Sequence, residues 1–347
     1  MDFVSSDANQ QQSQLVLAID GGGTSCRLAV GKYHADSEQL ELITCSVGGS
    51  ANPATLGIEF TLGRLDELLA SILPAVDAPS DTVASVMIGM AGVGQTRFSD
   101  HVNGWARSRF STARHFRVTT DVSMLMTSAD VCRAAAQLRE TRSVDLRTIA
   151  DKGRGQRQSV VLVAGTGSVA LTRDVNGVEC QAGGWGYLLG DEGSGYWIGR
   201  RALQCCLGEA FPDRFDALPS EFARVICKHV GVPEPRGLIQ AIYGAEDPRL
   251  EIARVAGSVN IAAQTGNETA RSILAEATGN LELLVKQLVR DERPYELIMA
   301  GGVLQHSEWI RSRLIDRLRP ADTCLIERAE LVGLVRAGLA AARTHPT

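Results

Sequence analysis

Long apolar runs are absent from this chain of 347 residues, and none approaches the roughly 20 residues that a membrane-spanning helix requires. A basic excess is absent as well. The formal net charge is −5, which gives no reason to expect nucleic acid or an anionic membrane as a partner. Residues 1–14 lack both a basic start and an apolar segment, so we expect a disordered tail there rather than a signal peptide. We expect a cytoplasmic protein that is long enough for two domains.

Cysteine pairs with Cys-x-x-Cys spacing are also missing. No two of the eight cysteines have the Cys-x-x-Cys spacing that is typical of metal and redox sites. The cysteines are Cys26, Cys45, Cys132, Cys180, Cys205, Cys206, Cys227 and Cys324. They are scattered through segments predicted to be strands or helices, which is typical of small buried apolar residues in a reducing compartment. We therefore favour a structural role for them over a metal or cluster role.

Glycine, in contrast, is abundant, and residues 159–199 are the stretch around which the chain is organised. Residues 160–164 form a β-branched apolar run that predicts a strand buried on both faces. Gly165-Thr166-Gly167-Ser168 predicts a sharp turn, and residues 169–173 predict a returning strand. Asn176-Gly177 is a strong hairpin signal, because both central positions of a type I′ turn need positive φ.

Two more glycine-rich loops follow in the same stretch. Gly183-Gly184-Trp185-Gly186 is the first, and Gly190-Asp191-Glu192-Gly193-Ser194 is the second, which leads into a predicted helix. Two carboxylates and one large aromatic residue among so many glycines would make a poor core. We therefore interpret these loops as part of a binding site.

A similar hairpin is predicted near the N-terminus. Residues 15–19 read as a buried strand, Asp20-Gly21-Gly22-Gly23-Thr24 as the turn, and residues 25–30 as a returning strand. A Walker loop or a Rossmann fingerprint would place a helix after its glycines, but a strand follows here. Backbone N–H groups and a threonine hydroxyl at such a hairpin tip can surround phosphate oxygens. Two hairpins of this kind indicate a duplicated domain with a phosphate held between its halves.

Five short motifs occur in a fixed order along the chain. They are Asp20-Gly-Gly-Gly-Thr24, Gly165-Thr-Gly-Ser168, Gly183-Gly-Trp-Gly186, Gly190-Asp-Glu-Gly-Ser194 and Ala300-Gly-Gly-Val303. This set resembles that of N-acetylglucosamine kinases, which belong to the BadF/BadG/BcrA/BcrD group of the actin, sugar kinase and Hsp70 ATPase superfamily. The resemblance covers residues 15–342. It implies an α/β fold of two ribonuclease H-like (actin-like ATPase) domains, each a mixed five-stranded sheet flanked by helices, with an interdomain cleft.

This resemblance sets the expected domain boundaries. We expect an N-terminal domain over residues 15–138 and a C-terminal domain over residues 159–347. The polar stretch 139–158 looks like an insertion between them, which we interpret as a solvated loop. Helical periodicity predicts a helical subdomain over about 205–290. The resemblance makes that subdomain a dimer-forming surface, although the sequence alone does not show a dimer.

The resemblance implies that ATP and Mg²⁺ bind to the glycine-rich turns. The residues expected to bind ATP are Gly22, Gly23, Thr24, Gly165, Thr166, Gly167, Gly301 and Gly302. Asp20 is the candidate for Mg²⁺, directly or through water, because Mg²⁺ keeps much of its hydration and takes one or two carboxylates. Two alternatives stay open: Asp20 as a residue bonded within its own turn, and Gly301-Gly302 as a plain turn from strand to helix.

A sugar is the second substrate that the resemblance implies. The residues expected to contact it are Asn52, Gly92, Asp121, Gly184, Trp185 and Asp191. Asp121 ends a Thr-Thr-Asp motif and is the implied catalytic base, since a carboxylate can accept a hydroxyl proton and orient the oxygen for in-line attack. The alternatives are a helix cap for Asp121, an Asx turn before Pro53 for Asn52, and core packing for Trp185.

We therefore predict an ATP-dependent sugar kinase that converts N-acetylglucosamine to N-acetylglucosamine 6-phosphate. Glucosamine and N-acetylmuramate kinases share these motifs and remain alternatives. Val122, where the resembling kinases commonly have alanine, and Ala182 are positions that bear on this choice. An activase-type ATPase of the 2-hydroxyacyl-CoA dehydratase kind is less favoured, because no iron–sulfur motif is recognisable. A non-catalytic sugar sensor is disfavoured by the intact Asp20, Thr24 and Asp121.

Overall fold

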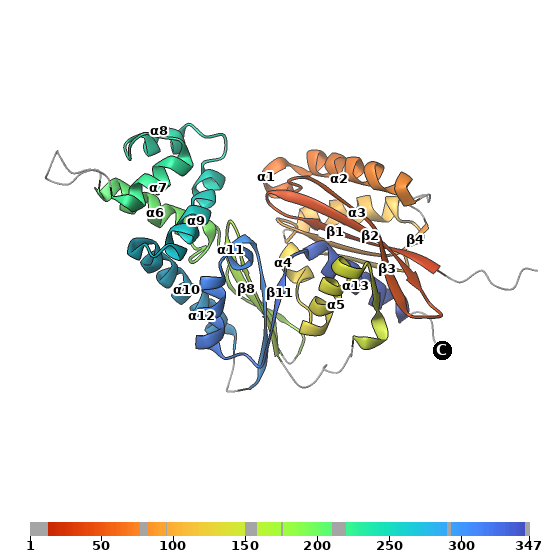
Figure 1. Ribbon diagram of the computed structural model, residues 1–347. Helices are drawn as coiled ribbons and strands as arrows, with labels where there is room; N and C mark the ends of the chain where they lie inside the picture. The colour runs from red at the N-terminus through yellow and green to blue at the C-terminus, as the bar shows by residue number, and fades with distance from the viewer. Residues whose placement is uncertain are drawn as a thin grey trace, which may run out of the picture. The chain divides into compact units, whose positions relative to one another are not determined.

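The computed structural model consists of two compact units. Unit 1 comprises residues 1–154 and 328–347, and unit 2 comprises residues 155–327 (Figure 1). The structure describes residues 13–76, 82–94, 96–149, 158–174, 176–209, 220–289 and 293–343. The disordered tail predicted for residues 1–14 lies outside this part, except that its last two residues begin the first strand.

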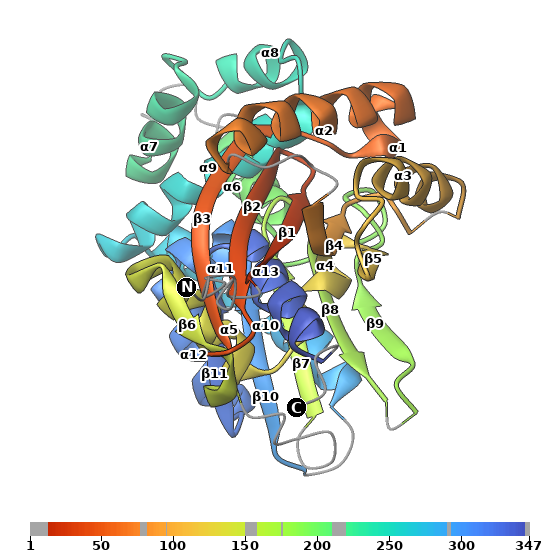
Figure 2. The ribbon, with the colours of Figure 1, turned by 90° about the vertical axis from the view of Figure 1, so that its right-hand side faces the viewer.

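Unit 1 is built on a mixed sheet. Its strands are β1 (Ser13–Gly21), β2 (Ser25–His34), β3 (Gln39–Gly49), β4 (Val83–Met90), β5 (His115–Thr119) and β6 (Ser143–Asp145). Their order is β5-β4-β1-β2-β3-β6, and Figure 2 shows β4, β1, β2 and β3 side by side. β1, β2 and β3 form an antiparallel meander, whereas β4 and β5 run parallel to β1. The prediction was five strands, and the sixth is β6, which pairs antiparallel with β3.

Helices cover both faces of this sheet. They are α1 (Pro53–Leu56), α2 (Ile58–Ile72), α3 (Thr96–Arg109), α4 (Asp121–Met124), α5 (Ala129–Thr141) and α13 (Ala329–Ala342), with 3-10 helices η1 (Leu73–Val76) and η3 (Leu146–Thr148). α2 and α3 lie on one face, and α5 and α13 lie on the other (Figure 1). Leu17 and Ile19 of β1 pack with Leu65 of α2 in one buried cluster, because alternate residues of a strand point to the same face.

The end of the chain corrects the predicted boundary of the C-terminal domain. Residues 328–347 were expected in that domain, but they cluster with unit 1. The reason is packing, because α13 lies against β1, β2 and β4. Its residues Leu331, Leu334 and Val335 are at most 1% exposed. The last helix therefore completes the core of unit 1.

The polar stretch 139–158 also differs from the solvated loop that was predicted. α5 continues to Thr141, and β6 then joins the edge of the sheet. Val144 and Leu146 are buried, at 1% and 3% exposure, so this part of the stretch contributes to the core of unit 1. Residues 150–157 lie outside the described part of the chain.

Unit 2 repeats the same plan with five strands. These are β7 (Gln158–Ala164), β8 (Ser168–Arg173), β9 (Glu179–Gly183), β10 (Tyr295–Ala300) and β11 (Asp322–Ile326). β7, β8 and β9 are an antiparallel meander, and β10 and β11 run parallel to β7, in the order β11-β10-β7-β8-β9. The order matches that of the first five strands of unit 1, which confirms the predicted duplicated α/β fold.

The turn between β8 and β9 differs from the predicted type I′ turn. Gly177 has φ of +79°, but Asn176 is not among the described residues with positive φ. The side chain of Asp174 instead accepts hydrogen bonds from the backbone N–H groups of Asn176 and Val178, each at 2.9 Å. The local carboxylate therefore replaces the asparagine as the residue that shapes this turn.

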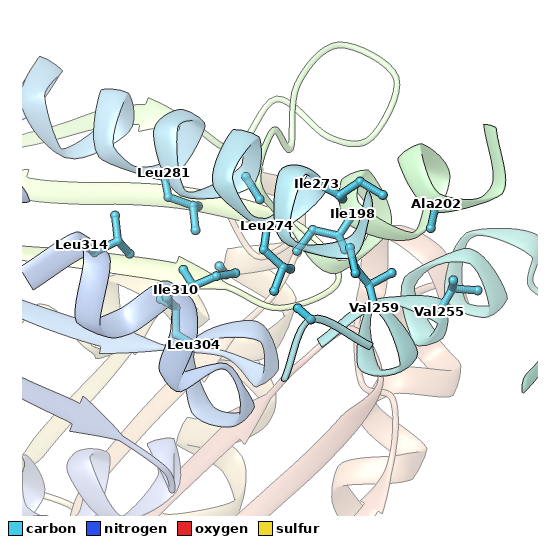
Figure 3. Packing of buried hydrophobic residues seen from close by; sticks show 14 of the residues in the cluster. Ile198, Ala202, Val255, Val259, Ile273, Leu274, Leu281, Leu304, Ile310 and Leu314 are labelled. Carbon is cyan, nitrogen blue, oxygen red and sulfur yellow. The ribbon is translucent and has the colours of Figure 1, made fainter. Parts of the chain in front are cut away.

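The helices of unit 2 form a second buried core. They are α6 (Gly195–Glu209), α7 (Glu221–Val230), α8 (Gly237–Tyr243), α9 (Pro248–Gln264), α10 (Glu268–Leu288), α11 (Gly302–His306) and α12 (Glu308–Leu318). Figure 3 shows Ile198 of α6 and Val259 of α9 within this core. α6 and α9 pack backbone to backbone at Gly199, where a Cβ atom would lie 1.8 Å from the carbonyl oxygen of Ile252. The helical subdomain predicted for about 205–290 corresponds to α6–α10 and begins at Gly195.

Two further expectations concern cysteines and membranes. All eight cysteines are free thiols, and Cys26, Cys132, Cys206 and Cys227 are buried. Burial raises the pKa of the Cys26 thiol to about 12, which keeps it protonated and unreactive. Among the described residues, no helix combines the length and the apolar character needed to cross a membrane.

Candidate functional site

The tip of the β1–β2 hairpin is the first part of the candidate site. The N–H of Gly22 donates to the carbonyl of Ser25 at 2.9 Å and closes the turn. Gly23 and Thr24 are exposed, and a Cβ atom added to Gly23 would meet nothing within 4 Å. Because the backbone at this tip is bare and the space around it is open, a phosphate could approach the N–H groups closely. This geometry suits the ATP-binding role predicted for Gly22, Gly23 and Thr24.

Asp121 lies at the end of β5, where the chain enters α4. Thr120 is the N-cap of α4, because its hydroxyl accepts from the N–H of Ser123 at 3.0 Å. The capping role that was the alternative for Asp121 is therefore performed by its neighbour. Burial raises the pKa of Asp121 above its ordinary value, although hydrogen bonds from its own N–H and that of Val122 oppose this shift. A carboxylate with a raised pKa is a better proton acceptor than an exposed one.

Asp20 is electrostatically coupled to two other carboxylates in unit 1. The pKa of Asp20 is raised to about 7, mainly by burial and further by the charges of Asp121 and Glu330, while Arg27 opposes the shift. The fold of unit 1 thus brings Asp20, the candidate for Mg²⁺, near Asp121, the implied catalytic base. Among the described residues, no group of three or more His, Cys, Asp or Glu side chains could hold a metal ion. The surroundings of Asp20 do suit a cation, since a positive charge there would offset the carboxylates around it.

Glu330 is a charged residue that the sequence reasoning missed. It lies in the first turn of α13 with no exposed surface and pairs with the guanidinium of Arg328. Its second oxygen, Oε2, has no hydrogen-bond partner among the described residues. The available signal was a glutamate at the start of a largely apolar helix, where a negative charge is favourable in any case.

Asn52 and Gly92, two predicted sugar contacts, lie against each other in unit 1. Asn52 is the N-cap of α1, and its Oδ1 accepts from the N–H of Ala54 at 2.9 Å. Gly92 has φ of +78°, and a Cβ atom there would lie 2.2 Å from Oδ1 of Asn52. Asn52 therefore forms the Asx turn before Pro53 that was the alternative to a sugar contact. This turn uses only the amide oxygen of Asn52 and not its N–H₂ group.

In unit 2, two glycine loops meet at the ends of β7 and β10. The N–H of Gly165 donates to the carbonyl of Gly167 at 2.9 Å, which forms the tight turn. Gly301 has φ of +92°, and a Cβ atom there would lie 2.5 Å from the carbonyl oxygen of Ala164. A Cβ atom on Gly165 would be 3.8 Å from the nitrogen of Gly302. Four of the predicted nucleotide-binding residues, Gly165, Gly167, Gly301 and Gly302, therefore lie in two adjoining loops of bare backbone.

Asp191 is the most constrained residue of the second glycine-rich loop. It has φ of +63° and only 3% exposure. Its Oδ1 accepts from the N–H of Ser168 at 3.1 Å, and a Cβ atom on Gly167 would lie 2.8 Å from Oδ2. Burial raises the pKa of Asp191, the N–H of Ser168 and the charge of Arg249 lower it, and Glu192 raises it. The other oxygen, Oδ2, is buried and has no hydrogen-bond partner among the described residues.

Gly184 and Trp185 belong to the first glycine-rich loop, a few residues before Asp191 in the chain. Gly184 has φ of +74°, and its N–H donates to the carbonyl of Ser168 at 3.0 Å. Trp185 is 65% exposed, which rules out the core packing that was its alternative. Leu188 and Leu189 are also exposed, at 78% and 82%. This loop therefore presents apolar surface that is available for contact with a ligand.

Arg249 and Tyr187 complete the surroundings of Asp191, and the sequence reasoning named neither. The Nη2 atom of Arg249 is 3.7 Å from Oδ2 of Asp191, and its guanidinium lies 5.3 Å from the ring centroid of Tyr187. The ring of Tyr187 in turn meets that of Tyr196 edge to face, with centroids 5.2 Å apart. Only the packing of α9 brings Arg249 to this loop, so no local pattern could have indicated it.

Comparison with known proteins agrees with this arrangement. The chain is 25% identical to the N-acetylmuramic acid/N-acetylglucosamine kinase of Clostridium acetobutylicum over 299 residues, which cover 85% of this chain and 87% of the relative. It is 24% identical to the N-acetyl-D-glucosamine kinase of Dictyostelium discoideum over 307 residues, or 84% and 86% of the two chains.

A solved structure extends the likeness to the fold. The crystal structure of a protein proposed as an N-acetylglucosamine kinase from Chromobacterium violaceum matches 94% of this chain and 99% of its own, with a TM-score of 0.61 and 23% identity. At that identity the likeness supports the fold alone. A family model matches residues 17–319, which is most of the chain. The chain therefore belongs to the BadF/BadG/BcrA/BcrD ATPase family.

Proposed function

We propose that this protein is an ATP-dependent sugar kinase that transfers the γ-phosphoryl group of ATP to the 6-hydroxyl of N-acetylglucosamine. The observation that carries the proposal is Asp121, a partly buried carboxylate with a raised pKa at the carboxyl end of β5, beside a second carboxylate at Asp20. Ligands of α/β sheets gather at the carboxyl ends of the strands. The two relatives named as sugar kinases, which match most of the chain, support the same assignment.

In the proposed reaction, Asp121 accepts the proton of the sugar 6-hydroxyl as the oxygen attacks the γ-phosphorus. The new O–P bond forms while the bond from the γ-phosphorus to the bridging oxygen of ADP breaks, and ADP leaves with that electron pair. The raised pKa of Asp121 suits this role, because proton transfer is most effective when the base has a pKa nearer to the working pH.

The nucleotide contacts in this proposal come from bare backbone. The N–H groups of the turns at Gly22–Thr24 and Gly165–Gly167 would hold the phosphates, and Gly301 and Gly302 would let the adenosine lie on the main chain. Asp20 would hold Mg²⁺ through water. Such an ion supplies Lewis-acid stabilisation of the charge on the phosphate oxygens.

The sugar contacts in this proposal are polar and few. Asn52 offers its amide N–H₂ group, and Gly92 leaves room for it. The carboxylate of Asp191 would accept hydrogen bonds from sugar hydroxyl groups, since its Oδ2 has no hydrogen-bond partner among the described residues. Trp185 and the backbone of Gly184 would cover an apolar face of the sugar. A site with several hydrogen-bonding groups for hydroxyls rejects substrates that lack those hydroxyls.

The test is ADP release with Mg·ATP and glucose, glucosamine, N-acetylglucosamine or N-acetylmuramate, in the wild type and in Asp121→Asn. We expect turnover with an amino sugar and a loss of about 10²–10⁴-fold in kcat for Asp121→Asn, with an unchanged KM for ATP. Asp130→Asn is the matched control, because Asp130 is an exposed partner of Arg133 on α5. ATP hydrolysis that is indifferent to every sugar and to Asp121 would contradict the proposal and favour an activase-type ATPase.

A further inference from the structure

Glu330 is a charged side chain that is completely buried in unit 1. It lies in the first turn of α13, and none of its surface is exposed. Its Oε1 atom pairs with the guanidinium of Arg328, whereas Oε2 has no hydrogen-bond partner among the described residues. Burial of an ionised carboxylate is costly unless its charge is offset. A negative charge at a helix N-terminus is also favourable in an exposed position, so the helix alone does not explain the burial.

The packing of α13 shows which end of β1 its first turn approaches. A Cβ atom on Gly333 would lie 3.0 Å from the Cβ of Ala18, in the second half of β1. Further along the helix, a Cβ atom on Gly338 would lie 3.2 Å from the side chain of Leu40. The sheet register places Leu40 level with Gln14, at the beginning of β1. α13 therefore runs from the carboxyl end of β1 towards its beginning, and its first turn lies at the carboxyl end.

Glu330 therefore lies close to two other carboxylates at this end of the sheet. Asp20 follows Ala18 by two residues, so it points to the face of the sheet that α13 covers. Glu330 precedes Gly333 by about one helical turn, which brings it to the same place. α13 also contacts α4, whose first residue is Asp121. Consistent with this geometry, the pKa of Asp20 is raised by burial and then by the charges of Asp121 and Glu330.

We propose that Glu330 is a positioning residue for the divalent cation of the nucleotide, and that its buried negative charge strengthens the binding of Mg²⁺ at Asp20. The inference deepens the proposed function, since it rests on Asp20 as the residue that would hold Mg²⁺. Glu330 acts through Asp20, because among the described residues no three His, Cys, Asp or Glu side chains are grouped as ligands of one ion. A buried charge is screened by solvent much less than an exposed one, so it acts on a cation without touching it.

Arg328 distinguishes this role from a purely structural one. Its guanidinium pairs with Glu330 and offsets part of the negative charge that acts at Asp20. If Glu330 acts by its charge, loss of Glu330 should weaken cation binding and loss of Arg328 should strengthen it. If the pair only holds α13 on the sheet, both losses should weaken binding. The sign of the Arg328 effect therefore separates the two roles.

The test measures how much Mg²⁺ strengthens nucleotide binding in the full-length protein. Calorimetry gives the affinity for a non-hydrolysable ATP analogue, adenylyl imidodiphosphate, in EDTA and in excess Mg²⁺, and the ratio of the two affinities is the cation gain. The variants are Glu330→Gln, Glu330→Asp, which keeps the charge, and Arg328→Gln. Asp130→Asn is the control, because Asp130 is a partly exposed carboxylate of the same unit that pairs with Arg133. Mn²⁺ in place of Mg²⁺ allows the bound ion to be followed by electron paramagnetic resonance.

We expect Glu330→Gln to lower the cation gain about tenfold or more, because changes to groups that support metal ligands cost about 10–100-fold in metal affinity. Its affinity in EDTA should be unchanged or higher, since a negative charge is removed from the surroundings of the phosphates. Glu330→Asp should keep most of the gain, Arg328→Gln should raise it, and Asp130→Asn should match the wild type. An equal loss of affinity with and without Mg²⁺ in Glu330→Gln would overturn the inference, and so would a gain that Arg328→Gln does not raise.

Two further controls keep the outcome decisive. Circular dichroism checks that each variant folds, and Arg328→Gln decides the inference by itself if Glu330→Gln does not fold. Asp20→Asn should lower the cation gain, and Glu330→Gln should then have little further effect, because it acts through Asp20. A full effect of Glu330→Gln in that background would refute the inference.

The outcomes are distinct from those that test the proposed function. The binding measurements contain no sugar, so they decide the role of Glu330 even if no sugar is turned over. A cation gain that Glu330→Gln leaves unchanged would reject the inference, as would the absence of any gain in the wild type. Sugar turnover that depends on Asp121 would in either case leave the proposed kinase standing.

Discussion

Gly199→Ala should destabilise unit 2, because it adds an atom where α6 and α9 are in backbone contact. The new Cβ would lie 1.8 Å from the carbonyl oxygen of Ile252 and 3.3 Å from Cβ of Val255. Ordinary contacts of a Cβ atom are no shorter than about 3.0–3.4 Å, so the two helices would have to move apart by more than 1 Å. A backbone carbonyl cannot rotate away as a side chain can. The buried residues Ile198 and Val259 would therefore lose part of their packing.

The magnitude follows from two opposing effects. Overpacking of a well-packed core costs about 1–3 kcal/mol, and we take the upper end because the obstacle is backbone. Alanine in a helix interior is about 1 kcal/mol more favourable than glycine. The free energy of unfolding should therefore fall by about 2 kcal/mol, which corresponds to a loss of about 4–8 °C in Tm for a domain of this size.

Thermal unfolding followed by circular dichroism and by calorimetry measures this change. Gly257→Ala is the matched control on α9, since a Cβ atom there would meet nothing within 4 Å, and it should raise the free energy of unfolding by up to about 1 kcal/mol. A Gly199→Ala protein as stable as the wild type would refute the reasoning.

Three further predictions concern the proposed kinase. The kcat/KM of the sugar should fall as the pH is lowered through the raised pKa of Asp121, at a higher pH than an ordinary exposed aspartate would give, and a pH–rate profile up to neutral pH measures this. Gly92→Ala should raise the KM of the sugar at least about tenfold, because its Cβ would meet Asn52 Oδ1 at 2.2 Å in a backbone conformation with φ of +78°. Trp185→Ala should raise the same KM while the free energy of unfolding stays within about 0.5 kcal/mol, since the ring is 65% exposed.

The strands and hairpins could be predicted because their signals are local. The apolar run at residues 160–164 predicted most of β7, Gln158–Ala164, and the glycine turns after β1 and β7 predicted the two antiparallel hairpins. The duplicated plan of two mixed sheets was expected from the family resemblance, whereas the strand order comes from the structure. β6 gave no signal, because Ser143–Asp145 is only three residues long and mostly polar, and it is held by its pairing with β3.

The side chains that the sequence could not place depend on contacts between distant segments. Arg249 reads as a solvated charge in a helix, and it reaches Asp191 only because α9 packs on α6. Glu330 reads as a favourable charge at a helix N-terminus, whereas α13 buries it against the sheet of unit 1. Thr120 and Asp121 are adjacent and both can cap a helix, so only the structure shows that the hydroxyl caps and leaves the carboxylate available.

The position of α13 sets an order of events for the chain as it leaves the ribosome. Domains usually fold as units, with the N-terminal one first during synthesis. Here the segment that packs on β1, where Gly333 faces Ala18, is made only after every strand and helix of unit 2. Unit 2 is continuous in sequence and can close its core while unit 1 still lacks α13. The half of the protein that begins first is therefore finished last, and the apolar surface that α13 covers stays exposed until the end of synthesis.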